Sequence, residues 1–289
     1  DSGKNFSRIF LTLKIFKMED HVNYQVKHTG SEFDPVKYHS MFDLSDDLEV
    51  KVLKDIGPQK KSVVVIDNFY KDPDSIRQLC LDSHKRNDPG LLSYLPGERV
   101  YLETSAVKQK IKHVFDELCF DTDIWGGGLW QRKDWHDREW GRAAFICNVI
   151  NDRTLMDKPD GIIPHQDAYH MELKMVNSLT QFGAVIYLNT PEECHGGTNL
   201  WSFDGQMSLP MKGPTGIEPP HYSIDSMSED EIFDHIYTEL HNSNRWKVEH
   251  EIEMVYNRMA LYESKVLHSQ NVDLGMFTEY DRINQVLFM

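Results

Sequence analysis

Three residues in this sequence have the types and the spacing of a metal site. His165 and Asp167 stand two positions apart in the segment 161–169, and His268 follows later in the chain. If the segment is extended, successive side chains alternate between its faces, so His165 and Asp167 point in the same direction. Two imidazoles and one carboxylate on one side of a divalent ion such as iron(II) leave the opposite positions open for a substrate and O2. We therefore predict that His165, Asp167 and His268 are metal ligands and catalytic residues.

The His-x-Asp pair is a weak signal when it is taken alone. Such pairs occur by chance, and the chain contains 14 histidines, most of which must be ordinary surface or core residues. We interpret His170, His195 and His221 in this way, although His195, which precedes a double glycine, is the best substitute ligand. The order of the segments around the pair strengthens the prediction of a metal site.

Runs of strand-forming residues separate the two histidines of the predicted site. Residues 182–189 form one run, and a Pro-containing loop with a double glycine at 196–197 joins it to a second run. A strand, a turn and a second strand in this arrangement predict a β-hairpin. Residues 257–263 predict a further strand, which is entered through an Asn turn and leads into His268.

In this order, the motifs resemble those of the iron(II)- and 2-oxoglutarate-dependent dioxygenases, in particular the prolyl-hydroxylase-like branch. The shared series is His-x-Asp, a strand ending Tyr-Leu-Asn, a Gly-Gly-Thr turn, an Asn-Arg-aliphatic strand, the distal histidine and a basic residue on the last strand. It covers roughly residues 140–289, with a weaker echo that starts at Val63. The resemblance implies a mainly β fold with flanking helices (α+β), namely a double-stranded β-helix, the jelly-roll barrel that cupins share.

The resemblance also implies a set of cofactors and the residues that hold them. The metal would be iron(II), 2-oxoglutarate would be the co-substrate, and Arg282 would hold its distal carboxylate through a bidentate fork. Asn284 shares a strand face with Arg282 and stands where the family usually has Ser or Thr. Tyr187 and Asn148 complete the predicted co-substrate contacts. Asp167 favours hydroxylation over halogenation, because a halide would need its coordination position.

Other interpretations of the same residues stay open. Arg282 could be a surface arginine paired with Asp281 or Glu279, and Tyr187 could be a half-buried core residue. A cupin-like metal-binding protein or enzyme could use the triad without 2-oxoglutarate, and it would not need Arg282 near the metal. A zinc hydrolase can also use two histidines and an aspartate, whereas a non-enzymatic descendant would lose its metal affinity. Binding of 2-oxoglutarate discriminates between these classes.

Composition limits the expected partners and compartment. The chain has 289 residues, of which 40% are hydrophobic, and a formal net charge of −15. A surface this acidic repels phosphate backbones, so we expect no nucleic-acid partner, and the apolar runs are too short to span a bilayer. The four scattered cysteines are typical of a reduced, cytoplasmic protein. The expected partners are O2 and a small-molecule or peptide substrate, with a homodimer left open.

The chain is expected to contain one large domain with an N-terminal extension. We predict that residues 1–60 form the extension, packed on the barrel, and that residues 61–289 form the dioxygenase domain. An insertion at about 205–245 contains a predicted helix at 228–241, and it could cover the substrate, decorate the periphery or form a dimer contact. Four tryptophans within 125–140 could line a substrate pocket or close over a sheet edge.

Local signals place two helices and two strands ahead of the metal segment. Residues 62–69 are rich in β-branched side chains and predict a strand. Asp72 before Pro73 predicts the N-terminus of a helix, and apolar residues at helical spacing over 105–118 predict a second helix. Residues 142–151 predict the strand that leads into the metal segment.

Overall fold

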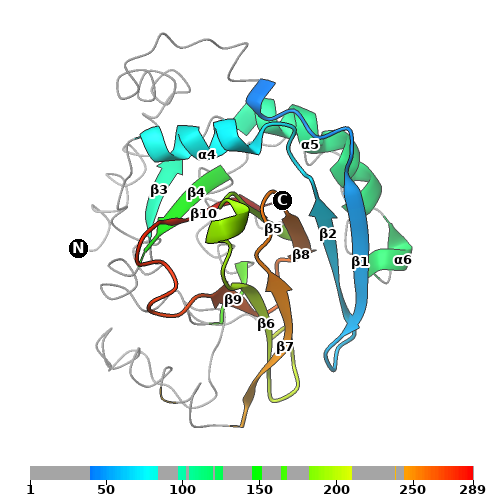
Figure 1. Cartoon of the computed structure of the whole chain (residues 1–289). Coiled ribbons are helices and arrows are strands. Elements are labelled where there is room, and N and C mark those ends of the chain that lie inside the picture. Colours follow the sequence, from blue (N-terminus) through cyan, green and yellow to red (C-terminus); the bar gives the residue numbers. More distant parts are fainter. Residues whose placement is uncertain are drawn as a thin grey trace, which may run out of the picture.

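The structure is a computed structural model of the 289-residue chain. It describes residues 40–83, 97–101, 104–119, 121–125, 145–151, 164–167, 182–209, 238 and 244–288. The predicted tryptophan cluster after Trp125, most of the N-terminal extension and, apart from residue 238, the helix predicted at 228–241 lie outside the described residues. Within them, the chain forms two antiparallel sheets, with helices along one of the sheets (Figure 1).

The larger sheet contains seven strands in the order β1-β2-β8-β5-β10-β4-β3. Its strands are β1 (Glu49–Ile56), β2 (Lys61–Asp67), β3 (Glu98–Tyr101), β4 (Phe145–Ile150), β5 (Phe182–Tyr187), β8 (Met259–Glu263) and β10 (Arg282–Phe288). Every residue of β5 and β8 is buried, because these central strands are covered on both faces. The predicted strands at 62–69, 142–151, 182–189 and 257–263 are confirmed, with ends that differ by a few residues, and β10 is the predicted last strand that carries Arg282 and Asn284.

The smaller sheet contains three strands in the order β7-β6-β9. These strands are β6 (Gly197–Phe203), β7 (Trp246–Glu253) and β9 (His268–Asn271). It packs against one face of the larger sheet, and apolar side chains of both sheets form a common core. Members of this intersheet core include Val63, Val65, Val185, Leu200, Ile252, Ala260 and Val272.

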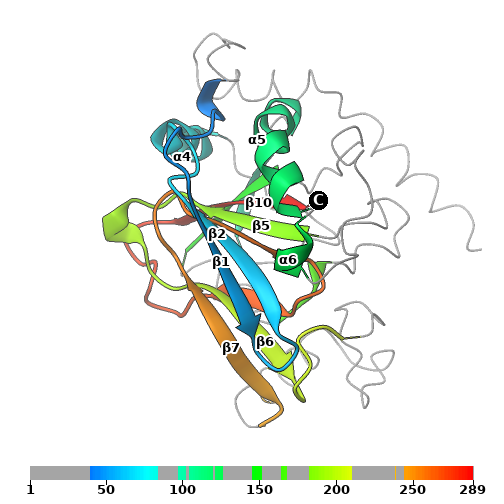
Figure 2. The same cartoon turned by 90° about the vertical axis from the view of Figure 1, so that its right-hand side faces the viewer.

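Helices cover the other face of the larger sheet (Figure 2). They are α4 (Pro73–Asp82), α5 (Thr104–Cys119) and the short α6 (Thr122–Trp125). Asp72 caps α4 by accepting a hydrogen bond from the Ser75 backbone N–H at 3.1 Å. A second apolar core lies between helices and sheet and includes Val64, Ile66, Ile76, Phe115, Ile186, Leu261 and Leu287. The mainly β fold with helices packed on one sheet is confirmed.

The predicted hairpin between residues 182–189 and the following run is wrong. β5 pairs with β8 and β10 in the larger sheet, whereas β6 pairs with β7 and β9 in the smaller one. The double glycine allows close backbone approach instead of a hairpin turn. A Cβ at Gly196 would lie 1.9 Å from the Asn271 carbonyl oxygen, and one at Gly197 would lie 2.0 Å from that of Ile252. The connection therefore crosses from one sheet to the other.

The edge strand β1 belongs to the segment that was expected to form the N-terminal extension. It pairs along its length with β2, and the expected boundary at residue 60 falls in the turn that joins the two strands. Most of its side chains are exposed, so the contrast between apolar and polar positions that marks a half-buried strand is weak here. Among the described residues, no helix combines the length and the apolar character needed to cross a lipid bilayer.

Candidate metal centre

His165, Asp167 and His268 come together between the two sheets. The Nε2 atom of His268 lies 3.3 Å from Oδ2 of Asp167, and Nε2 of His165 lies 3.7 Å from Oδ1 of the same carboxylate. The potential ligand atoms of the three residues all lie within 4.8 Å of one another. Ligands about 2.1 Å from one ion and at right angles to each other lie roughly 3 Å apart. The three side chains therefore form a group that could hold a metal ion, as the sequence predicts.

The backbone fixes this group although the segment 164–167 belongs to neither sheet. His165 and His268 form an antiparallel bridge in which each backbone N–H donates to the carbonyl of the other at 2.9 Å. The Asp167 N–H donates to the Ser264 carbonyl, also at 2.9 Å. The segment 164–167 thus supplies His165 and Asp167, and its backbone is hydrogen-bonded to Ser264 and to His268, the third ligand.

The orientation of the His268 ring is set by the backbone. Its Nδ1 lies 2.8 Å from the Val266 carbonyl oxygen, so Nδ1 carries the proton of a neutral ring and Nε2 keeps its lone pair toward the site. Burial lowers the pKa of His268, but the charge of Asp167, its hydrogen bond and the Val266 carbonyl outweigh burial and raise the pKa overall. The negative charge of Asp167 therefore favours a positive charge at this point.

Two residues that the sequence analysis did not select border the metal group. A Cβ at Gly183 would lie 2.8 Å from Oδ2 of Asp167 and 3.2 Å from the Tyr262 ring, so only glycine leaves room for the carboxylate. The Tyr262 ring centre lies 4.8 Å from that of His268. A glycine in the interior of a strand indicates close approach of another group. The position of Gly183 within the predicted strand 182–189 was therefore the feature of the sequence that indicated this contact.

Arg282 is buried in the space between the sheets. One of its terminal nitrogens donates to Oδ1 of Asn284 and, at 3.4 Å, to Oε1 of Gln270, while the other donates to the Gly197 carbonyl at 3.3 Å. Its Nε has no hydrogen-bond partner among the described residues. The alternative of a surface arginine paired with Asp281 or Glu279 is wrong, because Arg282 is 1% exposed.

The charge of Arg282 is not balanced within the described part of the chain. No carboxylate of the described residues pairs with it, and its contacts are all to neutral oxygens. Burial lowers its pKa to about 10, and the nearby Tyr187 and Tyr262 oppose this only in part. An unpaired buried charge costs several kcal/mol, so the site favours an anion beside the guanidinium.

Arg282 and the metal group face the same intersheet space. Gln270, which contacts Arg282, follows His268 by two residues on β9, so both side chains leave the same face of that strand. Two residues of a strand span roughly 7 Å, so the residue that contacts Arg282 is the next one after His268 on this face of β9. The charges of both Asp167 and Arg282 act on Tyr262. Burial raises the pKa of Tyr262, the charge of Asp167 raises it further, and the charge of Arg282 lowers it.

The other predicted contacts of the co-substrate have different positions. The Tyr187 hydroxyl is fully buried and lies 2.7 Å from Oγ1 of Thr198, while the Arg282 guanidinium lies 5.8 Å from the Tyr187 ring centre. Asn284 accepts a hydrogen bond from Arg282 through its Oδ1. Asn148 pairs with Asn284 in the β4–β10 ladder, and its side chain lies outside the described part of the structure.

His195, the best substitute ligand in the sequence, is not part of the metal group. Its side chain is exposed and stacks on Tyr280, with ring centres 6.1 Å apart. The described residues contain one group of metal-ligating side chains, and His195 does not belong to it. His170 and His221 lie outside the described residues.

Comparisons with known proteins add a match to one family. A model of a family of unknown function (DUF6445) matches residues 157–282. This segment contains His165, Asp167 and His268 and ends at Arg282. No curated protein matches the chain.

Proposed function

We propose that this protein is an iron(II)- and 2-oxoglutarate-dependent oxygenase that hydroxylates a small molecule or a peptide side chain. The observation that carries the proposal is Arg282, a buried cation without a carboxylate partner among the described residues, in the same intersheet space as the metal group. The facing sheets of seven and three antiparallel strands support a double-stranded β-helix as the fold.

The donor set fits iron(II). His165 and His268 supply neutral imidazoles and Asp167 supplies a carboxylate, which is the ligand set of non-haem iron(II) oxygenases with open positions opposite the protein ligands. Gly183 leaves room for the carboxylate, and the Val266 carbonyl holds His268 in the tautomer that a metal requires. These residues bind and orient the ion.

Arg282 fits the distal carboxylate of 2-oxoglutarate. Its contacts to Gln270 and Gly197, at 3.4 and 3.3 Å, are long for hydrogen bonds, and Nε has no partner in the part of the chain that the structure describes. A carboxylate can therefore replace weak contacts with two charge-assisted hydrogen bonds. When bound, the metal and the 2-oxo acid supply the oxidising chemistry, and the protein supplies binding, orientation and exclusion of water.

The test is anaerobic binding of 2-oxoglutarate to the iron(II)-loaded protein, followed by measurement of succinate after O2 is admitted. We expect Arg282→Ala to retain metal affinity and to lose at least about a hundredfold in 2-oxoglutarate affinity, since a bidentate charged contact is removed. His268→Ala should lose the metal. Arg245→Ala is the matched control, because Arg245 pairs with Asp204 outside the intersheet space and is partly exposed.

Two results would contradict the proposal. The first is a wild-type protein that binds iron(II) but neither binds nor consumes 2-oxoglutarate. The second is an Arg282→Ala variant that binds 2-oxoglutarate as tightly as the wild type does. Either result would favour a cupin-like metal-binding protein or enzyme that does not use this co-substrate.

A further inference from the structure

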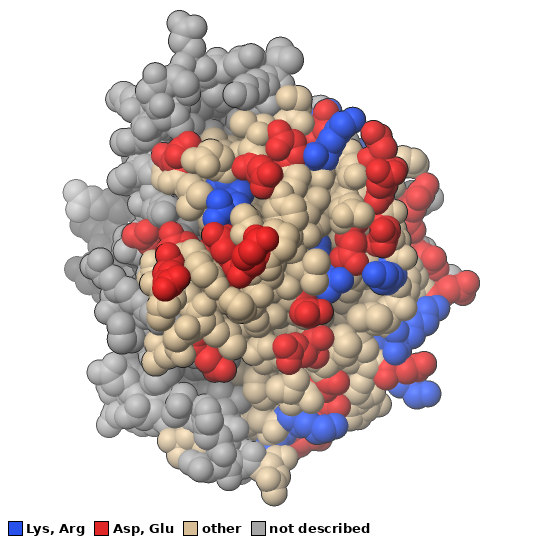
Figure 3. Space-filling model, viewed as in Figure 1, with Lys and Arg blue, Asp and Glu red and all other residues tan. Residues whose placement is uncertain are grey.

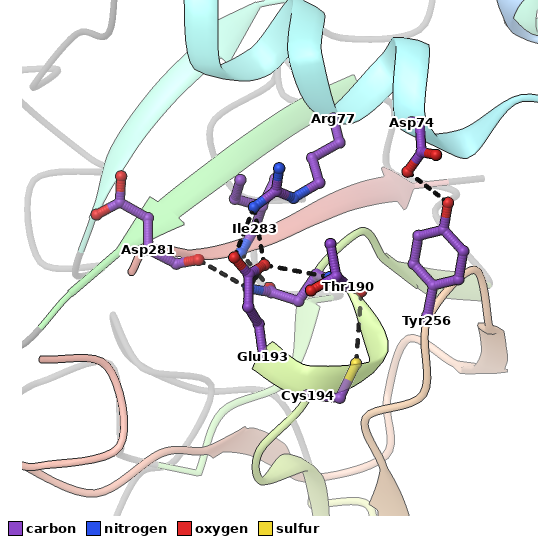
Figure 4. A network of polar contacts seen from close by, with 9 residues as sticks. Asp74, Arg77, Thr190, Glu193, Cys194, Tyr256, Asp281 and Ile283 are labelled. Carbon is purple, nitrogen blue, oxygen red and sulfur yellow. Dashed lines mark hydrogen bonds and ion pairs between the residues drawn. The ribbon is translucent and has the colours of Figure 1, made fainter. Parts of the chain in front are cut away.

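A network of polar contacts lies beside the start of β10 (Figure 4). It joins α4, the short helical turn η5 (Pro191–Glu193) and the backbone around Arg282. We infer that Asn189, at the centre of this network, is a positioning residue that holds Arg282 in the intersheet space. This inference rests on the proposed function for its consequence, and its structural part is testable without 2-oxoglutarate.

The side chain of Asn189 binds the backbone on both sides of Arg282. Its Nδ2 donates to the Asp281 carbonyl at 2.8 Å, and its Oδ1 accepts from the Ile283 N–H at 2.7 Å. Asn189 is completely buried. It lies just after the end of β5, and the Leu188 N–H donates to the Ile283 carbonyl at 3.0 Å. The amide of Asn189 therefore extends the β5–β10 pairing past the end of β5, to the residues that flank Arg282.

Arg282 needs such a restraint because of where it stands. It is the first residue of β10, and on the other side its ladder partner is Ile150, the last residue of β4. Strand ends open at low free-energy cost, and desolvation of an unpaired charge favours turning the side chain toward water. Two buried hydrogen bonds across residue 282 oppose that movement. Without them, the guanidinium would lose its fixed position relative to His268.

The outer part of the network fixes the Asn189 amide itself. Its Nδ2 also lies 3.4 Å from Oε2 of Glu193, so the nitrogen has two acceptors and the oxygen is left for Ile283. Glu193 in turn accepts from the Thr190 N–H at 3.2 Å and from Arg77 of α4 with both oxygens at 2.8 Å. Glu193 and Arg77 are both largely buried, which makes the support stronger than an exposed pair would be.

The proposed role predicts an effect on which 2-oxo acid binds. The distance from Arg282 to the metal group sets the length of dicarboxylate that can reach both. Loss of the two Asn189 hydrogen bonds should weaken binding of the five-carbon 2-oxo diacid more than binding of the four- and six-carbon 2-oxo diacids. A purely structural role of Asn189 would weaken all three equally.

The first arm measures affinity for the three acids in the iron(II)-loaded, oxygen-free protein. Asn189→Asp retains size and one acceptor but places a carboxylate against the Asp281 carbonyl and Glu193. We expect about a tenfold loss for the five-carbon acid, a smaller loss for the others, and unchanged metal affinity. Glu193→Gln, which weakens only the outer support, should give the same pattern with a smaller change. Tyr256→Phe is the matched control, because it removes a 2.6 Å bond to Asp74 of α4 and leaves residues 281–283 untouched.

The second arm needs no 2-oxo acid. In a double-mutant cycle, the denaturation midpoint of Asn189→Asp is compared in the wild-type and Arg282→Met backgrounds. If Asn189 holds a buried cation in place, its substitution should lower the midpoint more when the cation is absent, because in the wild-type background the released guanidinium regains water and offsets part of the loss. Equal effects in both backgrounds, or equal weakening of all three acids, would overturn the positioning role. A wild type that binds none of the acids would overturn the proposed function, while the cycle still decides the role of Asn189.

Discussion

Arg282 and the metal ligands differ in how the protein satisfies their polar atoms. The ligands are held by backbone hydrogen bonds and by each other: His268 through the Val266 carbonyl, and Asp167 through its backbone N–H. Arg282 has its backbone held by Asn189 but its charge unpaired within the described residues. A protein that had only to be stable would do better with an apolar residue at position 282. This energetic cost is expected of a residue that binds an anion, as proposed above for Arg282.

Gly183 offers a prediction at the same scale. In Gly183→Ala the new Cβ would lie 2.8 Å from Oδ2 of Asp167, so the carboxylate must move away from the two histidines. We expect metal affinity to fall about 10- to 100-fold, as it does when groups around a metal site are disturbed, while the fold is retained. Competition with a metal-binding dye measures the change. Gly205→Ala is the control, because its Cβ would meet no described atom within 4 Å. Its positive φ should make the variant lose stability without losing metal.

Among the elements, β2 and β8 are joined by an ion pair as well as by their ladder. Arg258, just before β8, donates to both oxygens of Asp67 at the end of β2, at 2.6 and 3.0 Å, and Lys51 of β1 adds a third contact at 3.0 Å. The hydrogen bond from Arg258, followed by that from Lys51, lowers the pKa of Asp67 against the opposing effect of burial. Three elements thus share one carboxylate.

This carboxylate predicts a pH dependence of stability. The folded-state pKa of Asp67 lies below its unfolded value of about 3.9, so the stabilisation is present above the unfolded pKa and is lost as the pH falls through the folded pKa. Asp67→Asn should lower the free energy of unfolding at pH 7. It should also make the decrease of this free energy with falling pH less steep. Urea denaturation from pH 7 to pH 3 measures both effects. Asp46→Asn, which breaks an exposed pair with Lys71, is the control and should change the free energy of unfolding at pH 7 very little, because exposed pairs contribute little.

At the scale of the whole molecule, the candidate site lies where the two sheets meet. Arg282 belongs to the larger sheet and contacts β6 and β9 of the smaller one, while His268 begins β9 and bridges to His165. Acidic side chains are spread among basic ones on the described face in Figure 3. A ligand held by the metal group and Arg282 together would join the sheets across their common core.

Binding should therefore stabilise the entire fold. A ligand at a hundred times its dissociation constant adds about 2.7 kcal/mol to the free energy of unfolding. We expect manganese(II), which resists oxidation, to raise the melting temperature, and 2-oxoglutarate to raise it further only when the metal is present. Differential scanning fluorimetry measures both steps. In Arg282→Ala the first step should remain and the second disappear, and a second step of wild-type size in that variant would contradict the assignment.

The sequence by itself determined the local elements and the set of reactive residues. Asp72 before Pro73 specifies the start of α4, and alternating or continuous apolar runs specify β2, β5, β8 and β10, because these patterns reflect contacts of each residue with its near neighbours. The spacing of His165 and Asp167 likewise placed both on one side of the segment. These features depend on a few consecutive residues.

Only the tertiary structure decided which of these elements and residues meet. It placed β5 and β6 in different sheets, brought Gly183 and Tyr262 against the metal group, and set Asn189 across residue 282 from a sequence distance of more than ninety positions. Local periodicity determines whether a segment is a strand but not which distant strand it will pair with, because that choice depends on how all the apolar faces are buried together. The buried, unpaired state of Arg282 follows from that collective packing.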